Sequence, residues 1–237
     1  MERAIVLSSG GVDSTTCVGL AIEKFGKDSV STVSVYYGQR HNKELECAEK
    51  IAKYYNVPHH VIDLSNTGIF NNSNCSLLAH STDTIKHKSY AEQIFSDGDT
   101  IVNTYVPFRN GLILSAVAAL ALSLYPQDDI SIYLGIHADD VVNNAYADCS
   151  VEFAEYMNKA VSFGTYNKVK LLSPLVTFNK SQVVAEGLRL GVPYELTWSC
   201  YEGGDKPCGK CATCLDREKA FKDNGVEDPA YAEVYKD

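Results

Sequence analysis

The sequence predicts an α/β fold: a mainly parallel five-stranded sheet with helices on both faces, followed by a small four-cysteine, zinc-binding subdomain at the carboxyl end. Three observations predict this fold. Short apolar or β-branched runs alternate with helix-compatible segments, a glycine-rich loop directly follows the first run, and four cysteines lie within fifteen residues. One domain with a small appendage is therefore expected.

Five runs are typical of strands, and five segments are typical of helices. The strands are expected at residues 3–7, 29–36, 59–64, 130–134 and 169–172. The helices are expected at residues 14–25, 43–55, 110–125, 150–161 and 180–190, with Gly164 and Gly191 placed to end the last two. Because helices separate most of the strands, we expect parallel strands covered on both faces.

A long polar segment, residues 65–103, interrupts this alternation. It is rich in Asn, Ser, Thr, Asp and His and is too long for an ordinary connection, so we interpret it as a mobile loop that covers the substrate. After residue 196 the periodic pattern gives way to the cysteines and a charged tail. We therefore expect a nucleotide-binding domain at residues 1–196 and a zinc-binding subdomain with its tail at residues 197–237.

Composition limits the classes of protein to which the chain can belong. With 237 residues, 45% apolar and 22% charged, it is long enough for one well-packed core. Its formal charge is 21 minus 30, or −9, and no basic run stands out, which argues against a nucleic-acid partner. The longest apolar-rich stretch, residues 112–124, is too short to span a bilayer, so we expect a cytoplasmic protein without a membrane partner.

The loop after the first strand has the features of a phosphate-binding site. Residues 8–14 read Ser-Ser-Gly-Gly-Val-Asp-Ser. Its glycines let the backbone approach an anion, and hydroxyls and amides at the start of a helix favour negative charge. Asp13 also suits a Mg²⁺ ion beside phosphate, because hard cations prefer carboxylate oxygens. The alternative is a tight turn in which Asp13 or Ser14 only caps the helix.

The cysteine cluster consists of Cys200, Cys208, Cys211 and Cys214. Four thiolates without a nearby histidine favour one structural zinc ion at tetrahedral geometry. An iron–sulfur cluster also uses four thiolates and remains the alternative.

These motifs carry a family resemblance. The pattern Ser-Gly-Gly-x-Asp-Ser resembles the pyrophosphate loop of the ATP pyrophosphatases, which cleave ATP to AMP and pyrophosphate. Together with Trp-Ser-Cys-Tyr at residues 198–201 and Cys-Gly-Lys-Cys at residues 208–211, nearly the whole chain resembles the 7-cyano-7-deazaguanine synthase family of queuosine precursor biosynthesis. Further stretches agree in order: residues 37–41, 104–110, 135–138, 148–149 and 195–198. The resemblance implies a Rossmann-like fold of the adenine nucleotide alpha hydrolase type and a homodimer.

Members of that family are ligases that convert 7-carboxy-7-deazaguanine, ammonia and ATP to the nitrile. The resemblance implies that a carboxylate oxygen attacks the α-phosphorus of ATP and that pyrophosphate leaves toward the loop. Ammonia then displaces AMP to give the amide, and a second activation, of the amide oxygen, gives the nitrile. Backbone amides, Mg²⁺ bound with ATP and a cation would neutralise the developing charge.

Site residues follow from the loop, the cysteines and the resemblance. The expected catalytic residues are Asp13, Arg109 and Lys180. The residues expected to bind the nucleotide are Leu7, Ser8, Ser9, Gly10, Gly11, Val12, Asp13, Ser14, Thr15, Thr16 and Cys17. The residues expected to contact the substrate are Arg40, Asn110, His137, Asp148 and Cys149. Lys180 opens a helix, a poor place for a cation unless an anion lies close.

Other functions remain open. A tRNA thiolase or a lysidine-forming ligase shares the phosphate loop, but the charge of −9 argues against RNA. A protein-modifying ligase of the same lineage would have the same active-site residues. Ala147 stands where the family usually has proline, which leaves the identity of the acyl acceptor open. In another class, the four-cysteine unit is a zinc-ribbon binding module, although the charges around it are balanced.

Overall fold

The computed structural model describes residues 1–90, 92–93 and 101–231, apart from the side chains of residues 142–144. Within this part, five strands form one sheet in the order β3-β2-β1-β4-β5, and all neighbours are parallel. The strands are β1 (Glu2–Leu7), β2 (Val30–Tyr36), β3 (His59–Asp63), β4 (Asp129–Tyr133) and β5 (Val169–Leu172). The predicted fold class and the parallel five-stranded sheet are confirmed.

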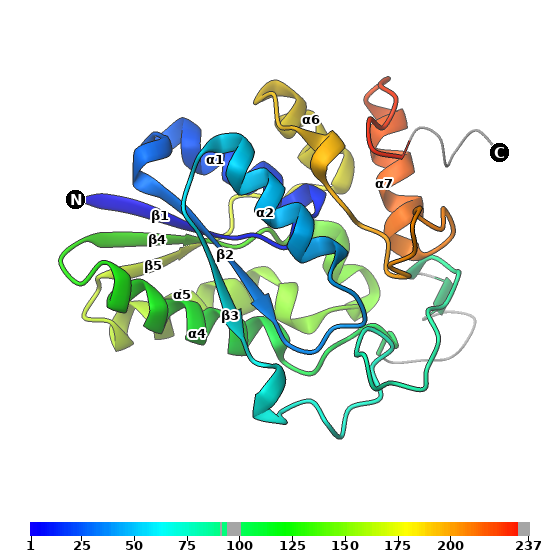
Figure 1. Cartoon of the computed structure of the whole chain (residues 1–237), viewed down its shortest axis with the longest axis horizontal. Helices are drawn as coiled ribbons and strands as arrows, with labels where there is room; N and C mark the ends of the chain where they lie inside the picture. The colour runs from blue at the N-terminus through cyan, green and yellow to red at the C-terminus, as the bar shows by residue number, and fades with distance from the viewer. Residues whose placement is uncertain (91, 94–100, 232–237) are drawn as a thin grey trace.

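Helices cover both faces of the sheet (Figure 1). One face carries α1 (Val12–Phe25), α2 (Lys43–Tyr55) and α6 (Lys180–Arg189), with α7 (Ala212–Asp223) packed on α6. The other face carries α4 (Arg109–Leu124) and α5 (Val151–Gly164). Short 3₁₀ helices lie at Lys27–Ser29, Ser65–Thr67, Ala138–Asn144, Ala147–Cys149 and Tyr194–Leu196. The ten predicted elements are present within three residues at each end, and α2 and β5 have the expected bounds.

Two predicted details are wrong. Helix α7 lies after residue 196, in the part of the chain for which no helix was predicted. It was not predicted because its apolar residues do not form a clear helical stripe. The left-handed residues after α5 are Tyr166 (φ 56°) and Asn167 (φ 61°), whereas Gly164 is the last helical residue. Asn tolerates this conformation, so no glycine is required there. Gly191 (φ 65°) does follow α6 as expected.

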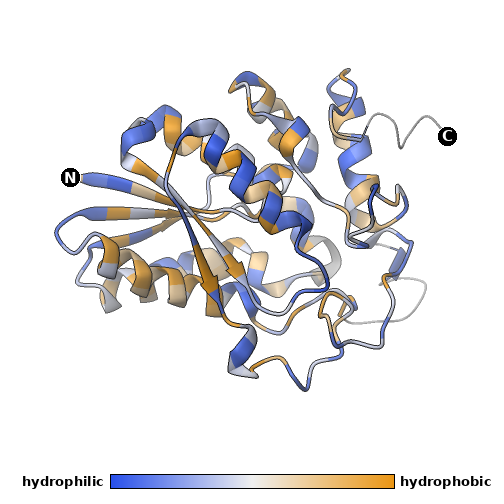
Figure 2. Ribbon diagram, in the orientation of Figure 1, coloured by the Kyte–Doolittle hydropathy of each residue, from blue (hydrophilic) through white to orange (hydrophobic). Residues whose placement is uncertain are grey.

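The core consists of two layers, one on each face of the sheet. Because successive side chains of a strand point to opposite faces, Ile5 packs in the layer of α4, and Ala4 and Val6 pack in the layer of α1. In Figure 2, α2 and α7 carry many hydrophilic residues, whereas α4 is mostly hydrophobic. Phe221 of α7 belongs to the α1 layer, so the carboxyl-terminal helix shares a core with the sheet. The division at residues 196 and 197 stays a prediction.

The chain order creates a crevice beside β1. From β1 the chain passes to β2 and β3 on one side and later returns to β4 on the other side. In open parallel sheets, ligands bind outside the carboxyl ends of the strands at such a switch point. The fold therefore places the loop after β1 at the position where a ligand is expected.

The polar segment at residues 65–103 lies partly outside the described residues, which omit residues 91 and 94–100. Its described part packs against the loop after β2. The amide of Arg40 donates to the carbonyl of Leu77 at 2.8 Å, and the amide of Ala79 donates to the carbonyl of Gly38 at 2.9 Å. Leu78 is fully buried. The mobility of the segment stays a prediction.

None of the helices in the described part of the chain is both long enough and apolar enough to cross a membrane.

Candidate active site

A cavity of about 250 Å³ opens at the carboxyl ends of β1, β2 and β4. It lies at the switch point of the sheet, where the fold predicts a ligand. Many of the predicted site residues line it: Leu7, Ser8, Ser9, Asp13, Ser14, Arg40, Arg109, Asn110 and Cys149. The structure thus brings the predicted phosphate loop and most of the predicted substrate residues to one place.

The loop between β1 and α1 forms one wall of this cavity. Gly10 has a φ of 80°, and a Cβ atom there would lie 2.2 Å from the carbonyl oxygen of Glu44. Ser14 Oγ accepts a hydrogen bond from the amide of Ser9 at 3.2 Å, and the amide of Trp198 donates to the carbonyl of Gly10 at 2.9 Å. The loop is therefore held by its own serines and by the carboxyl-terminal segment, at the positive end of α1.

Besides Ser14, four residues predicted to bind the nucleotide are buried in α1: Val12, Thr15, Thr16 and Cys17. The Thr15 hydroxyl donates to the carbonyl of Gly11 at 2.7 Å. The Thr16 hydroxyl lies 2.8 Å from the hydroxyl of Tyr194. Burial raises the pKa of the Cys17 thiol, which belongs to the α1 core layer. These side chains are engaged by the protein, so a contact of the four residues with a nucleotide would use backbone groups.

Asp13 pairs with Lys180 beside the loop. Lys180 Nζ donates to both carboxylate oxygens of Asp13 at 2.7 Å and lies 3.3 Å from Nε2 of His137. Nε2 of His137 lies 3.4 Å from Oδ1 of Asp140. Burial raises the pKa of Asp13, but the charges of Lys180 and His137 outweigh burial and hold the pKa below its ordinary value. An anion therefore does lie close to Lys180.

The start of α4 carries a second group of predicted residues. Arg109 donates from Nη1 to the hydroxyl of Tyr37 at 3.3 Å. The amide of Asn110 donates to Oδ2 of Asp148 at 2.9 Å, and Asn110 Nδ2 donates to Sγ of Cys149 at 3.3 Å. The Asp148 carboxylate thereby satisfies an amide at the amino end of α4. Asn110 and Cys149 line the cavity, whereas Asp148 is not part of its lining.

Arg40 reaches the polar segment from the cavity wall. Its Nη2 donates to the carbonyl of Asp83 at 2.6 Å. The neighbouring His41 packs against Gly203, where a Cβ atom would lie 2.2 Å from its ring. Burial lowers the pKa of His41. Both residues thus join the loop after β2 to later parts of the chain.

Sequence reasoning missed several residues of the cavity wall: Tyr37, Glu44, Gly135, Asp140, Tyr146 and Tyr201. Gly135 follows β4, and a Cβ atom there would lie 3.0 Å from the backbone of Asp13 and Ser14. Its place directly after a predicted strand was the available signal. Tyr201 Oη lies 3.4 Å from Tyr146 Oη. No periodic pattern marks these two tyrosines, because they come together only in the folded chain.

The four predicted metal ligands form one cluster. Their sulfur atoms all lie within 4.8 Å of one another. Cys211 Sγ lies 3.5 Å and Cys208 Sγ 4.0 Å from Cys214 Sγ. The amide of Cys208 donates to Cys200 Sγ at 3.2 Å. The cluster could hold a metal ion, as the sequence predicts.

A buried ion pair connects this cluster to the rest of the chain. Arg217 of α7 is fully buried and donates from Nε and Nη2 to the two carboxylate oxygens of Asp228 at 2.6 and 2.9 Å. Its Nη1 donates to the hydroxyl of Thr197 at 2.9 Å, and the guanidinium lies 4.1 Å from the ring centre of Tyr231. Arg217 thus binds Thr197, and the amide of the adjacent Trp198 donates to Gly10 of the phosphate loop. The ion pair therefore stabilises the segment that contacts the loop.

The parallel sheet and the glycine-rich loop after β1 place the chain in the class of α/β enzymes that carry a pyrophosphate loop (PP-loop) after the first strand. A family model described as "Queuosine biosynthesis protein QueC" matches residues 3–225. The chain therefore belongs to the QueC family.

Relatives agree over nearly the whole length. The 7-cyano-7-deazaguanine synthase of Caldicellulosiruptor bescii is 40% identical over 232 residues, which cover 98% of both chains. That of Archaeoglobus fulgidus is 37% identical over 228 residues, 96% of this chain and 89% of that one. A solved U34-tRNA thiolase, NcsA from Methanococcus maripaludis with its [4Fe-4S] cluster, is 18% identical with a TM-score of 0.47; the match covers 99% of this chain and 69% of that one. The predicted family is confirmed, and with it an enzyme of queuosine precursor biosynthesis.

Proposed function

We propose that this protein is an ATP-dependent ligase that converts 7-carboxy-7-deazaguanine and ammonia to 7-cyano-7-deazaguanine. One observation carries the proposal: Ser8, Ser9 and Asp13 of the phosphate loop line one cavity at the switch point together with Arg109 of α4, and Lys180 is paired with Asp13. Relatives that carry the name 7-cyano-7-deazaguanine synthase match nearly the whole chain, which supports the choice of substrate.

The reaction begins with adenylation of the carboxylate. A carboxylate oxygen attacks the α-phosphorus, and pyrophosphate leaves toward the amides at the start of α1. Arg109 supplies positive charge in the cavity wall, and Lys180 supplies it from beside Asp13. Ammonia then displaces AMP to give the amide, and a second adenylation, at the amide oxygen, allows loss of AMP to give the nitrile.

Mg²⁺ accompanies ATP in this proposal. The donor set fits, because the carboxylates of Asp13 and Asp140 both line the cavity and offer the hard oxygen atoms that Mg²⁺ prefers. Lys180 keeps the carboxylate of Asp13 ionised and therefore ready to bind a cation. When bound, the ion would neutralise charge on the phosphates of ATP.

The deazaguanine is positioned by the second group of residues. Asn110, Asp148 and Cys149 are joined by hydrogen bonds, and Asn110 and Cys149 line the cavity beside Arg109. We assign Arg40 and His137 to the same task, Arg40 from the cavity wall beside the polar segment and His137 from beside Lys180. The place of Arg40 in the cavity wall and that of His137 beside Lys180 and Asp13 support these roles.

The metal in the cysteine cluster is one structural Zn²⁺ ion per chain. Sulfur atoms on a tetrahedron about 2.3 Å from one ion lie about 3.8 Å apart. The separations of 3.5 and 4.0 Å agree with a single ion. A four-iron cluster holds each thiolate on a different iron, which sets the sulfur atoms farther apart. Elemental analysis of the purified protein tests this: one zinc per chain is expected, and stoichiometric iron would contradict it.

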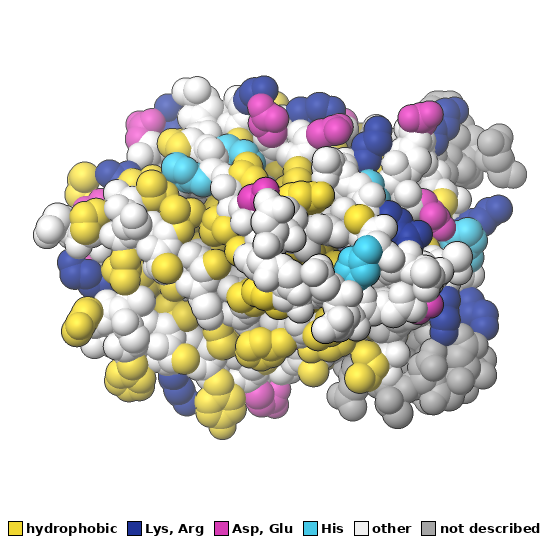
Figure 3. All heavy atoms as spheres, turned by 60° about the horizontal axis from the view of Figure 1, so that its bottom comes forward, with side chains coloured by type: hydrophobic (Ala, Val, Ile, Leu, Met, Phe, Trp, Pro, Cys, Tyr) yellow, Lys and Arg dark blue, Asp and Glu magenta, His cyan; other side chains and the backbone are white. Residues whose placement is uncertain are grey.

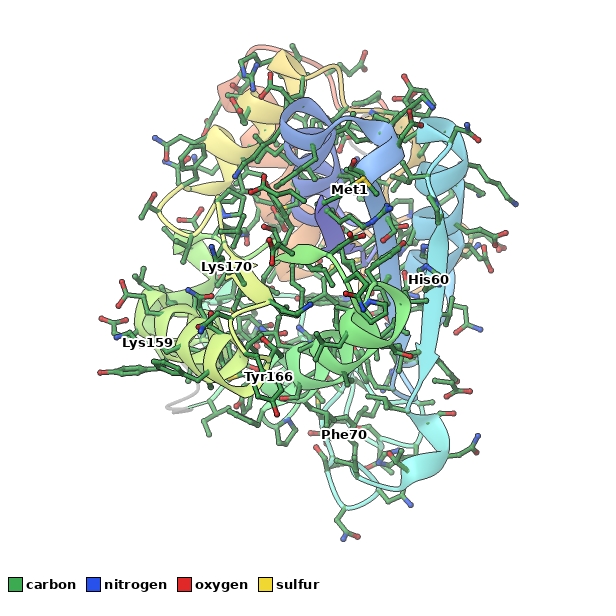
Figure 4. All side chains as sticks on the ribbon, turned by 90° about the vertical axis from the view of Figure 1, so that its left-hand side faces the viewer. Met1, His60, Phe70, Lys159, Tyr166 and Lys170 are labelled. Atoms are coloured by element: carbon green, nitrogen blue, oxygen red, sulfur yellow. The ribbon has the colours of Figure 1, made fainter. Side chains whose placement is uncertain are left out.

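A homodimer completes the proposal. Exposed aromatic side chains of α5 and the turn after it support it, because Tyr156, Phe163 and Tyr166 are 69%, 78% and 90% exposed. Figure 3 shows hydrophobic side chains on the face that lies at the bottom of Figure 1, where α4 and α5 lie. Figure 4 labels Lys159 of α5 and Tyr166 of the turn after it. Sedimentation should give twice the chain mass of 26.0 kDa, and Phe163→Glu should reduce it; a monomeric wild type contradicts the dimer.

The activity is tested by incubating the purified protein with ATP, Mg²⁺, ammonium and 7-carboxy-7-deazaguanine. Mass spectrometry should detect AMP, the amide and the nitrile. If AMP forms only with another carboxylate, the ligase class stands and the substrate is wrong. If no carboxylate leads to AMP, the ligase proposal is wrong.

A further inference from the structure

Glu44 lines the cavity next to the phosphate loop. It is the second residue of α2, and its carbonyl oxygen is the atom that a Cβ at Gly10 would meet at 2.2 Å. Its side chain contributes to the cavity wall together with Tyr37 and Arg109. Glu44 therefore stands between the loop and the start of α4, where the reacting carbon of an adenylated substrate would lie.

The other carboxylates of the cavity wall are already engaged. Both oxygens of Asp13 accept from Lys180, and Oδ2 of Asp140 accepts from the amide of His137 at 3.0 Å. Glu44 differs, because its carboxylate has no hydrogen-bond or ion-pair partner among the residues that the structure describes. Among the described residues of this wall, it is thus the carboxylate to which no protein group donates a hydrogen bond.

The surroundings of Glu44 favour its protonated form. Burial raises its pKa to about 7, although the positive charge of Arg109 opposes the shift. The Tyr37 hydroxyl faces it from the end of β2, and Cys47 lies one turn further along α2. Arg40 and His41 line the same cavity. The amino end of α2 would stabilise the carboxylate, so burial outweighs the helix dipole here.

We propose that Glu44 accepts the proton that ammonia loses when it attacks the adenylated carboxylate. The nitrogen lone pair forms a C–N bond to the carbonyl carbon, and the resulting ammonium group gives one proton to the Glu44 carboxylate. The carbonyl re-forms, the C–O bond to the phosphate breaks, and AMP leaves with that electron pair. Adenylate and ammonia thus become amide, AMP and a protonated Glu44, which returns its proton to solvent.

The proton acceptor decides which group leaves. While the nitrogen of the tetrahedral intermediate keeps its extra proton, ammonia is a good leaving group and the adenylate is regenerated. Once the proton has passed to a carboxylate, only AMP can leave. A base whose pKa lies close to neutrality suits this transfer. The earlier adenylation needs no proton acceptor, so the two steps should respond differently to a change of Glu44.

The test compares Glu44→Gln with Glu46→Gln, an exposed glutamate on the same helix, as matched control. Adenylation is followed as pyrophosphate exchange into ATP that depends on 7-carboxy-7-deazaguanine. Amide formation is followed by mass spectrometry, with rates expressed against the concentration of unprotonated ammonia at each pH. Glu44→Asp tests whether a shorter carboxylate supports amide formation. Thermal unfolding of each variant tests whether its fold is intact.

Glu44→Gln should keep exchange within about threefold, lose amide formation by roughly 100-fold or more, and lack the rise in rate through pH 7 that we expect of the wild type. Glu44→Asp should recover part of the rate. Amide formation by Glu44→Gln at the wild-type rate would overturn the proposal, as would an equal loss of exchange, which would place Glu44 in adenylation. The inference rests on the proposed function, and a wild type without exchange or amide would overturn both.

Discussion

Lys180 Nζ lies 2.7 Å from each carboxylate oxygen of Asp13 and joins the start of α6 to the first turn of α1 across 167 positions of the chain. The pair lies beside the phosphate loop, only partly exposed. A cation at the amino end of a helix is unfavourable by itself, and the Asp13 carboxylate compensates for it. Release of Lys180 from Asp13 would make the ammonium available to phosphate oxygens without moving α6.

Removal of the lysine charge should stop adenylation. Lys180→Met should lower substrate-dependent pyrophosphate exchange on the order of 100-fold, because a cation beside the leaving group is lost. Lys222→Met, on the exposed side of α7, is the control and should exchange at the wild-type rate. Exchange by Lys180→Met within a few-fold of the wild type would remove Lys180 from the catalytic residues.

The same pair predicts how stability depends on pH. The folded pKa of Asp13 lies below its ordinary value of 3.8, so the carboxylate adds stability above that value and loses it as the pH falls through the folded pKa. Wild type should therefore be more stable than Asp13→Asn at neutral pH, and the difference should shrink below pH 3.8. Urea unfolding at several pH values measures it, with Asp28→Asn, an exposed change, as control. A constant difference would contradict this linkage.

The phosphate loop should not tolerate a side chain at Gly10. Gly10→Ala combines a φ of 80° with a Cβ 2.2 Å from the carbonyl oxygen of Glu44. Gly26→Ala has a similar φ of 74° but nothing within 4 Å, so it separates backbone strain from collision. We expect Gly26→Ala to cost about 1 kcal/mol of unfolding free energy with full activity, and Gly10→Ala to lose more stability and most exchange. Equal losses of stability and exchange in the two variants would show that the atoms around Gly10 move to accommodate the added Cβ.

The buried pair between α7 and Asp228 should be needed for stability. Arg217→Met leaves the Asp228 carboxylate buried without its guanidinium, which should lower the free energy of unfolding by about 3–5 kcal/mol. Arg189→Met removes an exposed ion pair with Glu23 and should leave the urea midpoint unchanged. If both variants unfold at the wild-type midpoint, Arg217 does not hold the segment that carries Trp198.

Loss of one metal ligand should reduce stability before it affects chemistry. Cys211→Ser should lower both the zinc content and the Tm, because the remaining three thiolates no longer close a tetrahedral site. Cys47→Ser, outside the cluster, should keep the zinc. Full zinc content in Cys211→Ser would mean that this residue is not a ligand.

The order of the elements and the fold class were readable from the sequence alone, because they depend on local properties. Apolar runs of strand length, helical spacing and the glycines of the loop act over a few residues, so β1 to β5 and the helices α1, α2, α4, α5 and α6 lie close to their expected positions. The four cysteines were equally visible, since short spacing is itself the metal-binding signal. Helix α7 was missed because its burial comes from packing on α6, which its own pattern does not show.

The sequence by itself determined the fold class, the glycine-rich loop after β1 and the set of four cysteines that form one cluster. Only the tertiary structure decided which side chains meet in the site. Lys180 donates to Asp13, the amide of Asn110 donates to Asp148, and Glu44 lines the cavity. The physical reason is that charge and burial depend on neighbours brought together by the sheet order, whereas a motif reports only neighbours along the chain. The catalytic environment of Glu44 is therefore a property of the crevice beside β1.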